Sequence, residues 1–163
     1  MAKTIQIELN ENSIGKAIAE LKRYQVWVAE KEKELRIRLA MLGATVASIQ
    51  FSRAIYNGSN DISVRVDDTG SVAVIYAEGE SVAFIEFGSG AKYGYGHPTA
   101  GEHGFGPGTW SDGDEGKGRW DNPKGWWYGE SEHSYGNPPA MAMYDAVREM
   151  TENVTRIAQE VFR

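Results

Sequence analysis

The sequence predicts an α+β protein: a small antiparallel sheet of three to four strands packed on a long N-terminal helix and a C-terminal helix, with a long loop rich in glycine and aromatic residues. Apolar residues recur at helical spacing from Ile14 to about Ile55 and again in residues 138–163. They alternate at strand spacing in residues 61–76. The loop, residues 88–137, holds fourteen of the nineteen glycines and four of the five tryptophans, a composition that excludes a regular helix.

Length and composition indicate one domain. Its 163 residues, 41% hydrophobic and 25% charged, are typical of a soluble globular chain. We divide it into an N-terminal helical segment (1–57), the sheet (61–87), the loop (88–137) and the C-terminal helix (138–163). The absence of cysteine excludes disulfides and thiolate metal sites. No run approaches the ~20 apolar residues that cross a bilayer, and the N-terminus lacks the apolar core of a signal peptide, so we expect a cytoplasmic protein without a membrane partner.

The charge of the chain is acidic and uneven. A net charge of −6 argues against a protein whose main task is to grip phosphate backbones. Residues 1–57 carry nine basic and six acidic side chains, a balance of +3, whereas residues 58–87 carry one and six, a balance of −5. Such polarity either orients neighbours in an assembly or has no function, and we favour the second interpretation.

The first helix is predicted to begin at Asn12 or Ser13, either of which can cap it. A row of apolar residues seven positions apart marks its buried face: Ile14, Leu21, Val28, Leu35, Leu42 and Ile49. A second, interrupted row favours a kink or break around residues 22–25. At ~1.5 Å per residue the helix spans about 60 Å, more than one domain needs, so we expect part of it to pack on another molecule, such as a second copy. Asn57 and Gly58 are predicted to end it.

Five short segments have strand patterns. Residues 3–9 (KTIQIEL) alternate and predict a short strand. Residues 61–76 predict a β-hairpin whose turn is Asp67–Gly70. Val82–Phe87 is predicted as a third strand, antiparallel to the second, and Trp126–Tyr128 as a fourth strand that returns to the sheet.

The terminal helix has a clear start signal, because Asn137 is an N-cap residue and Pro138 and Pro139 suit the first helical positions. The residues that follow repeat at intervals of three and four, as in an amphipathic helix: Met143, Val147, Met150, Val154, Ile157 and Val161.

Glu86 is the first candidate for chemistry, since a carboxylate within an apolar strand can act as a general base with a raised pKa. No histidine, serine or second acid accompanies it at a fixed spacing, so we favour a strand residue on a solvated or inter-subunit face, paired with an Arg or Lys. Gly88-Ser89-Gly90 is not a phosphate-binding loop, because no Gly-Lys-Ser/Thr and no helix follow it. We therefore expect no catalytic residue.

A metal site would have to use the three histidines and the acids of the loop: His97, His103, His133, Asp112, Asp114 and Glu115. Their spacing, six and thirty residues between histidines among glycines, does not match the short ligand spacings of known metal motifs. We interpret them as polar loop residues and expect neither a metal nor another cofactor.

The loop holds too many aromatic residues for a solvated linker. They are suited to stacking on sugars or single-stranded nucleic acid, or to contact with protein, where Trp and Tyr dominate interface energetics. Few basic residues accompany them, so we favour protein contact. The candidate contact residues in the loop are Trp110, Trp120, Trp126, Trp127 and Tyr128.

Two short motifs carry a family resemblance. The first is Ala83–Gly90 (AFIEFGSG), and the second is Pro138–Ala146 (PPAMAMYDA). In this order, after a long helix and an acidic hairpin, they resemble the HK97 gp10-like family of tailed-phage proteins, which are tail-completion or head–tail joining proteins of siphophages and prophages. The order of elements is similar over nearly the whole chain, but only these motifs are specific. Some family members have a short connection between the motifs, whereas this chain has residues 91–137.

The resemblance implies a small α+β virion protein that is not an enzyme. It implies a homo-oligomeric ring, expected to be a hexamer, at the neck of a virion assembled in the cytoplasm of the bacterial host. Its partners would be head-completion or connector proteins and tail terminator or tail-tube proteins, with double-stranded DNA passing through the lumen without specific binding. Glu86, Phe87, Gly88 and Gly90 would lie at subunit contacts, the glycines as backbone pivots. The alternative is a binding module whose aromatic loop engages a glycan or a bacterial surface.

Overall fold

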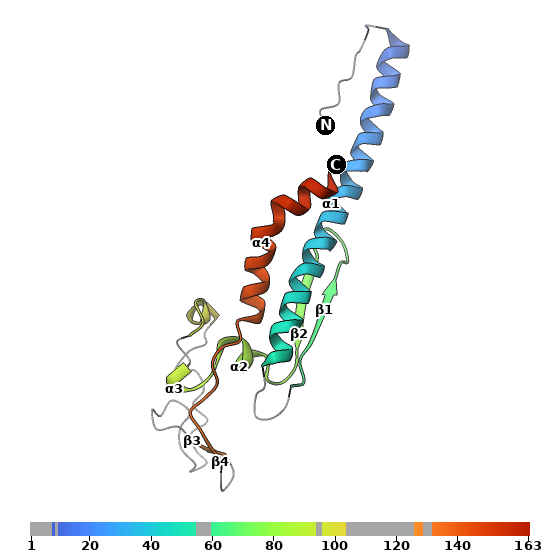
Figure 1. Cartoon of the computed structure of the whole chain (residues 1–163). Helices are drawn as coiled ribbons and strands as arrows, with labels where there is room; N and C mark the ends of the chain where they lie inside the picture. Colours follow the sequence, from blue (N-terminus) through green and yellow to red (C-terminus); the bar gives the residue numbers. More distant parts are fainter. Residues whose placement is uncertain (1–7, 9, 55–59, 94–95, 104–125, 129–131) are drawn as a thin grey trace.

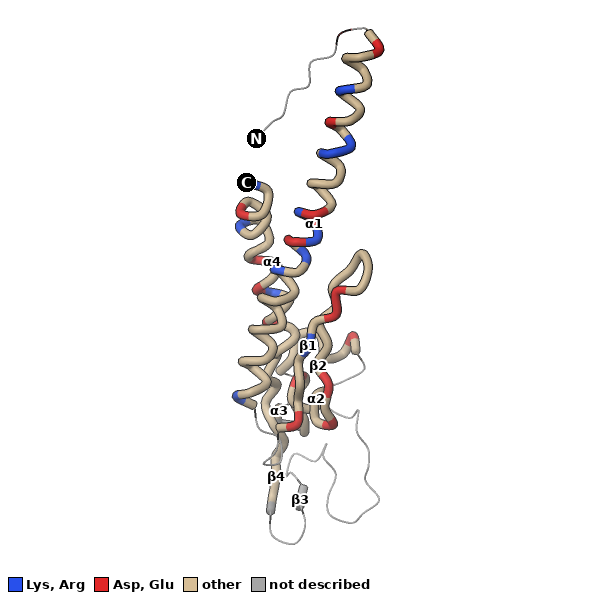
Figure 2. Tube along the Cα trace, turned by 90° about the vertical axis from the view of Figure 1, so that its right-hand side faces the viewer, with Lys and Arg blue, Asp and Glu red and all other residues tan. Residues whose placement is uncertain are grey.

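The computed structural model describes residues 8, 10–54, 60–93, 96–103, 126–128 and 132–163. Two helices, α1 (Glu11–Arg53) and α4 (Ala142–Val161), lie side by side, and a small sheet packs against another side of α1 (Figure 1, Figure 2). The fold is therefore α+β, with a long N-terminal helix and a C-terminal helix as the sequence predicts.

Helix α1 is unbroken over 43 residues, which corresponds to about 65 Å. Its N-cap is Asn10, whose Oδ1 accepts a hydrogen bond from the Ser13 N–H at 2.8 Å. Asn12 and Ser13, the predicted caps, lie inside the helix. The predicted break at residues 22–25 is wrong, and the ribbon shows no sharp kink there (Figure 1).

Helix α4 runs antiparallel to α1. At its C-terminal end, Phe162 lies edge-on to Trp27, with ring centroids 5.9 Å apart. Near its start, Asp145 Oδ2 accepts a hydrogen bond from Gln50 Nε2 at 3.1 Å. Because α4 ends level with Trp27, the part of α1 that precedes Trp27 extends beyond α4 (Figure 1).

The predicted hairpin is confirmed: β1 (Ser63–Asp67) pairs antiparallel with β2 (Val74–Glu78). Val64 lies opposite Ala77, and both side chains pack against the core on the face directed at α1. The connection between the strands is longer than the predicted turn. It is tied to α1 by an ion pair in which Arg36 Nε lies 2.9 Å from Asp68 Oδ1.

The predicted third strand is wrong. Val82–Phe87 forms a short helix, α2, in which the Ile85 N–H donates to the Ser81 carbonyl at 2.9 Å. This run is apolar without alternation, and such a run does not distinguish a buried strand from a buried helix. Trp126–Tyr128 is a strand, β3, but it pairs with β4 (Glu132–Ser134) in a separate sheet and does not return to β2. Among the described residues the main sheet therefore has two strands, not three or four.

After α2 the chain forms α3 (Gly90–Tyr93) and a short 3₁₀ helix, η1 (Ala100–His103). The predicted strand of residues 3–9 falls outside the described residues except for Glu8. The predicted end of the first helix at residues 57–58 is wrong, because α1 ends at Arg53 and the next residue, Ala54, has extended backbone (φ −88°, ψ 131°).

The core is small and rich in alanine. Its buried cluster joins α1, α2 and α4 through Ala47, Phe51, Ile85, Ala142 and Ala146. Small side chains let the helices approach closely, and Gly43 shows how closely: a Cβ there would lie 2.7 Å from both Ile75 Cδ1 and Met150 Sδ. None of the helices that the structure describes is long and apolar enough to cross a membrane.

Candidate functional site

Glu86 joins α2 to the start of α4. The residue is 5% exposed, and its two carboxylate oxygens accept backbone hydrogen bonds, Oε2 from the Met143 N–H at 2.9 Å and Oε1 from the Tyr144 N–H at 3.0 Å. The prediction of a strand residue on a solvated or inter-subunit face, paired with an Arg or Lys, is therefore wrong. Glu86 lies in the helix α2, its side chain is buried, and its hydrogen-bond partners are His97 and two backbone N–H groups of the same chain.

These bonds supply a cap that α4 lacks locally. The residue before the helix, Met141, has left-handed backbone (φ 53°) and makes no side-chain cap hydrogen bond. The first N–H groups of a helix have no partner within it, and they carry the positive end of the helix dipole. Glu86, more than fifty residues earlier in the sequence, satisfies two of these groups with an anionic side chain.

His97 is the second buried polar residue of the site. Its Nε2 lies 3.2 Å from Glu86 Oε1, and its Nδ1 accepts a hydrogen bond from the Thr99 N–H at 3.2 Å. Because Nδ1 accepts, the ring proton must be on Nε2, which then donates to Glu86. The imidazole is therefore neutral in this arrangement, and its proton is directed at a carboxylate that already holds two backbone donors.

Backbone hydrogen bonds also connect the segment of α2 and the residues after it with the segment that leads into α4. The Ala140 N–H donates to the Ile85 carbonyl at 2.7 Å, and the Ser89 N–H donates to the Asn137 carbonyl at 2.9 Å. Asn137 in turn donates its N–H to Ser89 Oγ at 3.2 Å. We call residues 85–90 and 137–144, together with His97, the Glu86 junction. The two motifs that carry the family resemblance meet here.

The glycines of the junction are needed for the shape of its backbone. Gly88 and Gly90 have φ values of 77° and 80°, in the left-handed region that disfavours other residues. A Cβ on Gly88 would also lie 2.9 Å from the Asn137 carbonyl oxygen and from the Pro139 ring. These glycines allow the turn by which the chain leaves α2 and lies against the segment that precedes α4, in agreement with the expected role of backbone pivots.

Phe87 faces a larger space beside the junction. Its ring lies edge-on to His97, with centroids 4.6 Å apart, and tilted to His103 at 5.5 Å. A pocket of about 620 Å³ opens here. Its apolar lining comes from four elements and includes Phe51, Ala77, Val82, Phe87, Met143 and Val147. We call it the β2–α4 pocket, because it separates the end of β2 from the first turns of α4.

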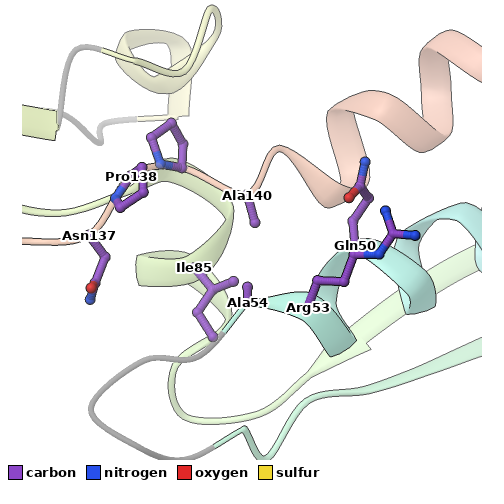
Figure 3. A pocket seen from close by; sticks show the side chains of 8 residues that line it. Gln50, Arg53, Ala54, Ile85, Asn137, Pro138 and Ala140 are labelled. Carbon is purple, nitrogen blue, oxygen red and sulfur yellow. The ribbon is translucent and has the colours of Figure 1, made fainter.

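A smaller pocket, of about 320 Å³, lies on another side of the junction (Figure 3). Gln50, Arg53 and Ala54 line it from the end of α1, and Ile85 and residues 137–140 line it from the junction. Only Ile85 among these residues is buried. The space is therefore an open crevice without a buried charged group that could select a ligand.

The predicted contact residues are divided between two places. Glu86 and Gly90 are buried in the junction, whereas Phe87 and Gly88 are half-buried there. The loop residues Trp126, Trp127 and Tyr128 form β3, away from the junction. Trp110 and Trp120 lie outside the described residues. That partners touch Phe87 or the loop aromatics stays a prediction.

Of the groups that were weighed as metal ligands, His97 is engaged by Glu86 and Thr99, and His133 lies in β4 with its ring 4.7 Å from that of Tyr135. In the part of the chain that the structure describes, no three His, Asp or Glu side chains lie close enough together to hold a metal ion. Asp112, Asp114 and Glu115 fall outside that part.

Sequence reasoning missed the partnership of Glu86, His97 and Thr99. The predicted helix start at Asn137 is wrong, because α4 begins at Ala142, five positions later, so Asn137 cannot cap it. The first N–H groups of α4 therefore need acceptors from elsewhere. Which side chain supplies them cannot be read from spacing, because the two segments meet only through tertiary structure.

Comparison with known proteins gives no relative. No family model, no curated protein and no solved structure matches the chain. Function therefore has to be inferred from the Glu86 junction and from the surfaces that the fold leaves exposed.

Proposed function

We propose that the chain is a structural subunit of a tailed-phage particle, of the HK97 gp10-like kind, that acts in head–tail joining or tail completion as part of a homo-oligomeric ring around the DNA channel. The observation that carries the proposal is the exposed apolar face on the first half of α1. The two resembling motifs support it, since they meet in one junction although about fifty residues separate them.

The exposed face consists of large apolar side chains, whose contact with water is unfavourable. Ile14, Ile18 and Leu21 are 43%, 49% and 54% exposed, and their spacing of four and three places them on one side of α1. This part of the helix projects past the end of α4 (Figure 1). We call it the α1 projection, residues 11–26. A regular apolar stripe on a projecting helix is typical of an interaction surface.

The chemistry of the junction favours a structural role over an enzymatic one. Glu86, the only candidate acid within an apolar run, holds the start of α4 with both carboxylate oxygens. A general base needs a free oxygen within hydrogen-bond reach of the proton it removes. An assembly protein needs no such group, and a rigid junction suits it.

The charge pattern is compatible with a channel lining. Residues 58–87 have a charge balance of −5, whereas α1 carries both signs of charge (Figure 2). Within that segment Glu86 is buried, and Asp68 and Glu78 are paired with arginines. The acidic groups that remain are Asp61 and Glu80, which are exposed, and Asp67, which is half-buried. An acidic surface repels the phosphates of passing DNA and so avoids tight binding. This part of the proposal requires β1 and β2 to face the lumen of the ring.

The test is deletion of the gene from the phage or prophage that carries it. We expect filled heads and separate or incomplete tails in electron micrographs of the lysate, with infectivity restored by the gene supplied in trans. Purified protein should form rings in negative stain, alone or on its neck partners. Normal infectious particles without the gene would contradict the proposal. Binding to a glycan array that is lost in Trp126→Ala would favour the binding module instead.

A further inference from the structure

The backbone just before α4 is held in an unfavourable conformation. Met141 has φ 53° and ψ 33°, and among the described residues it is the only one other than glycine with a positive φ. Left-handed backbone is disfavoured for a residue with a side chain, and it persists only where the surroundings impose it. Groups outside the helix therefore determine that α4 begins at Ala142.

These groups belong to α2. Ala140 and Met141 donate their N–H groups to two carbonyls of α2, at 2.7 and 3.3 Å. Two positions later, the N–H groups of Met143 and Tyr144 are held by the Glu86 carboxylate. Four backbone donors around the start of α4 thus bond to α2, and this attachment fixes the left-handed residue between them.

The residues before α4 are suited to a helix of their own. Pro139 would be favoured at the first helical position, where its missing N–H is not needed and its φ fits. It also keeps Pro138 extended, as the residue before a helix should be. Ala140 and Met141 have high helix propensity. Local preference and observed structure therefore disagree at residues 139–141, and such disagreement is typical of functional sites.

The two conformations compete for the same hydrogen-bond donors. In a longer helix, the Met143 N–H would bond to the Pro139 carbonyl and the Tyr144 N–H to the Ala140 carbonyl, four positions earlier. These are the two N–H groups that the Glu86 carboxylate accepts in the structure. Lengthening of α4 therefore releases the carboxylate, and binding by the carboxylate prevents lengthening.

We propose that the start of α4 is a two-state switch. In the closed state, which the structure shows, Glu86 caps a helix that begins at Ala142. In the open state α4 begins at Pro139, one turn earlier, Met141 has right-handed backbone, and the Glu86 junction is released.

The switch would move the base of the loop that the sequence places at residues 88–137. A residue that joins a helix shortens from about 3.3 Å to about 1.5 Å along the chain, so three residues draw Asn137 about 5 Å toward α4. α2 stays in place, because Ile85 is part of the buried core. The hydrogen bonds between Ser89 and Asn137, at 2.9 and 3.2 Å, would then break.

The inference rests on the proposed function for its trigger, which is contact with a neighbouring subunit or a neck partner. A partner shifts such an equilibrium only if it binds the open state more tightly. Glu86 and His97 are 5% and 6% exposed in the closed state. Opening removes the contacts that bury them, so a partner that binds these groups selects the open state. Assembly is thereby coupled to the loop that holds the predicted aromatic contact residues.

NMR chemical shifts distinguish the two states, because Pro139 and Ala140 are not helical in the closed one. In the full-length Glu86→Gln protein, which has a weaker cap, we expect their ¹³C shifts to move toward helical values. Adding Met141→Gly favours left-handed backbone and disfavours helix, so it should reverse the ratio of open to closed molecules by about tenfold or more. Shifts that move to random-coil values instead would overturn the switch, since loss of the cap would then only fray α4.

Met141→Ile tests the same point with Glu86 in place. A side chain branched at Cβ makes left-handed backbone still less favourable, whereas helix propensity falls only slightly. We therefore expect the open state to gain severalfold. Met141→Leu, of similar size but unbranched at Cβ, is the matched control and should resemble the wild type. Identical shifts at Ala140 in the two variants would show that the backbone at position 141 does not control where α4 begins.

A disulfide lock tests the coupling to assembly, because the chain has no cysteine of its own. The pair Ser89→Cys and Asn137→Cys joins two residues that already share hydrogen bonds, and so holds the junction closed. We expect the oxidised protein to form rings, alone or on neck partners, about tenfold less well than the same protein after reduction. The control pair, Ser63→Cys and Glu78→Cys, joins opposite residues of β1 and β2 and should assemble equally in both redox states.

The outcomes separate the switch from the proposed function. Rings that form equally well from the oxidised and reduced lock would overturn the switch and leave the proposed function standing. If the wild type forms no rings, the proposed function loses support. The shifts of Pro139 and Ala140 then decide by themselves whether the switch exists.

Discussion

The Glu86 junction and the α1 projection differ in whether their side chains find partners within the described chain. In the junction, the buried carboxylate, the buried imidazole and the start of α4 satisfy one another within the chain. In the α1 projection, apolar side chains such as Ile18 and Leu21 remain about half exposed, with no described element covering them. The residues that stabilise the fold and the residues that are exposed for contact with other molecules therefore lie in different regions. Substitutions in the junction should change the free energy of unfolding, whereas substitutions in the α1 projection should change association.

The largest expected effect is that of Glu86→Ala. The substitution removes two charge-assisted hydrogen bonds to the start of α4 and leaves the His97 N–H without its acceptor. Hydrogen bonds to a buried charged group each contribute about 1.5–3 kcal/mol, so we expect the free energy of unfolding to fall by about 3 kcal/mol or more. Denaturant unfolding followed by circular dichroism measures it.

Two variants control for Glu86→Ala. Glu86→Gln keeps one acceptor oxygen without the charge, so it should lose less stability than the alanine variant. Glu80→Ala removes an exposed carboxylate from the turn before α2 and should change the free energy by no more than about 0.5 kcal/mol. Equal, small effects at positions 80 and 86 would show that the junction does not hold the fold together.

Gly88→Ala should have the next largest effect on stability. The new Cβ would meet the Asn137 carbonyl and Pro139 at 2.9 Å, on a backbone with φ 77°. Strain of this kind costs about 1–3 kcal/mol, and thermal unfolding should show the loss as a lower melting temperature. Gly15→Ala is the matched control with the opposite sign, because Gly15 lies in the α1 projection with open space around it, and alanine favours a helix by up to about 1 kcal/mol.

Leu21→Lys should separate folding from association. Leu21 is 54% exposed, so the free energy of unfolding of the monomer should change by about 0.5 kcal/mol or less. A charge in the middle of the apolar stripe should nevertheless weaken ring formation or binding to neck partners, as measured by light scattering and electron microscopy. Lys22 is a neighbouring exposed position. If apolar area alone drives association, Lys22→Leu should strengthen association instead of weakening it. A Leu21→Lys protein that is less stable than the wild type but assembles normally would show that Leu21 contributes to folding and not to association, which contradicts the proposed role of the α1 projection.

The sequence predicted the two helices and the hairpin, because each has a regular local pattern. The same reasoning failed at Val82–Phe87, where an apolar run without alternation fits either a strand or a helix. It also failed at Glu86, whose partners Met143 and Tyr144 are distant in the sequence. Gly88 and Gly90 were expected to act as backbone pivots, and both have positive φ, but the close approach of Asn137 and Pro139 to Gly88 required the tertiary structure. That partners contact these glycines stays a prediction.

The smallest effect is expected at the exposed pair formed by Arg65 and Glu78 on the outer face of the hairpin, whose closest atoms are 2.8 Å apart. The hydrogen bond from Arg65 lowers the pKa of the Glu78 carboxyl below its ordinary value. The folded carboxylate thus binds its proton more weakly than the unfolded one, so this pair stabilises the fold above the ordinary glutamate pKa and stops doing so as the pH falls through the lowered value. An NMR titration should place the Glu78 midpoint below the ordinary value for glutamate, and Arg65→Gln should raise it toward that value. Because both side chains are in water, the accompanying change in stability should be far smaller than that of Glu86→Ala. A Glu78→Gln variant as unstable as Glu86→Ala would mean that the hairpin, and not the junction, is where the fold depends on a carboxylate.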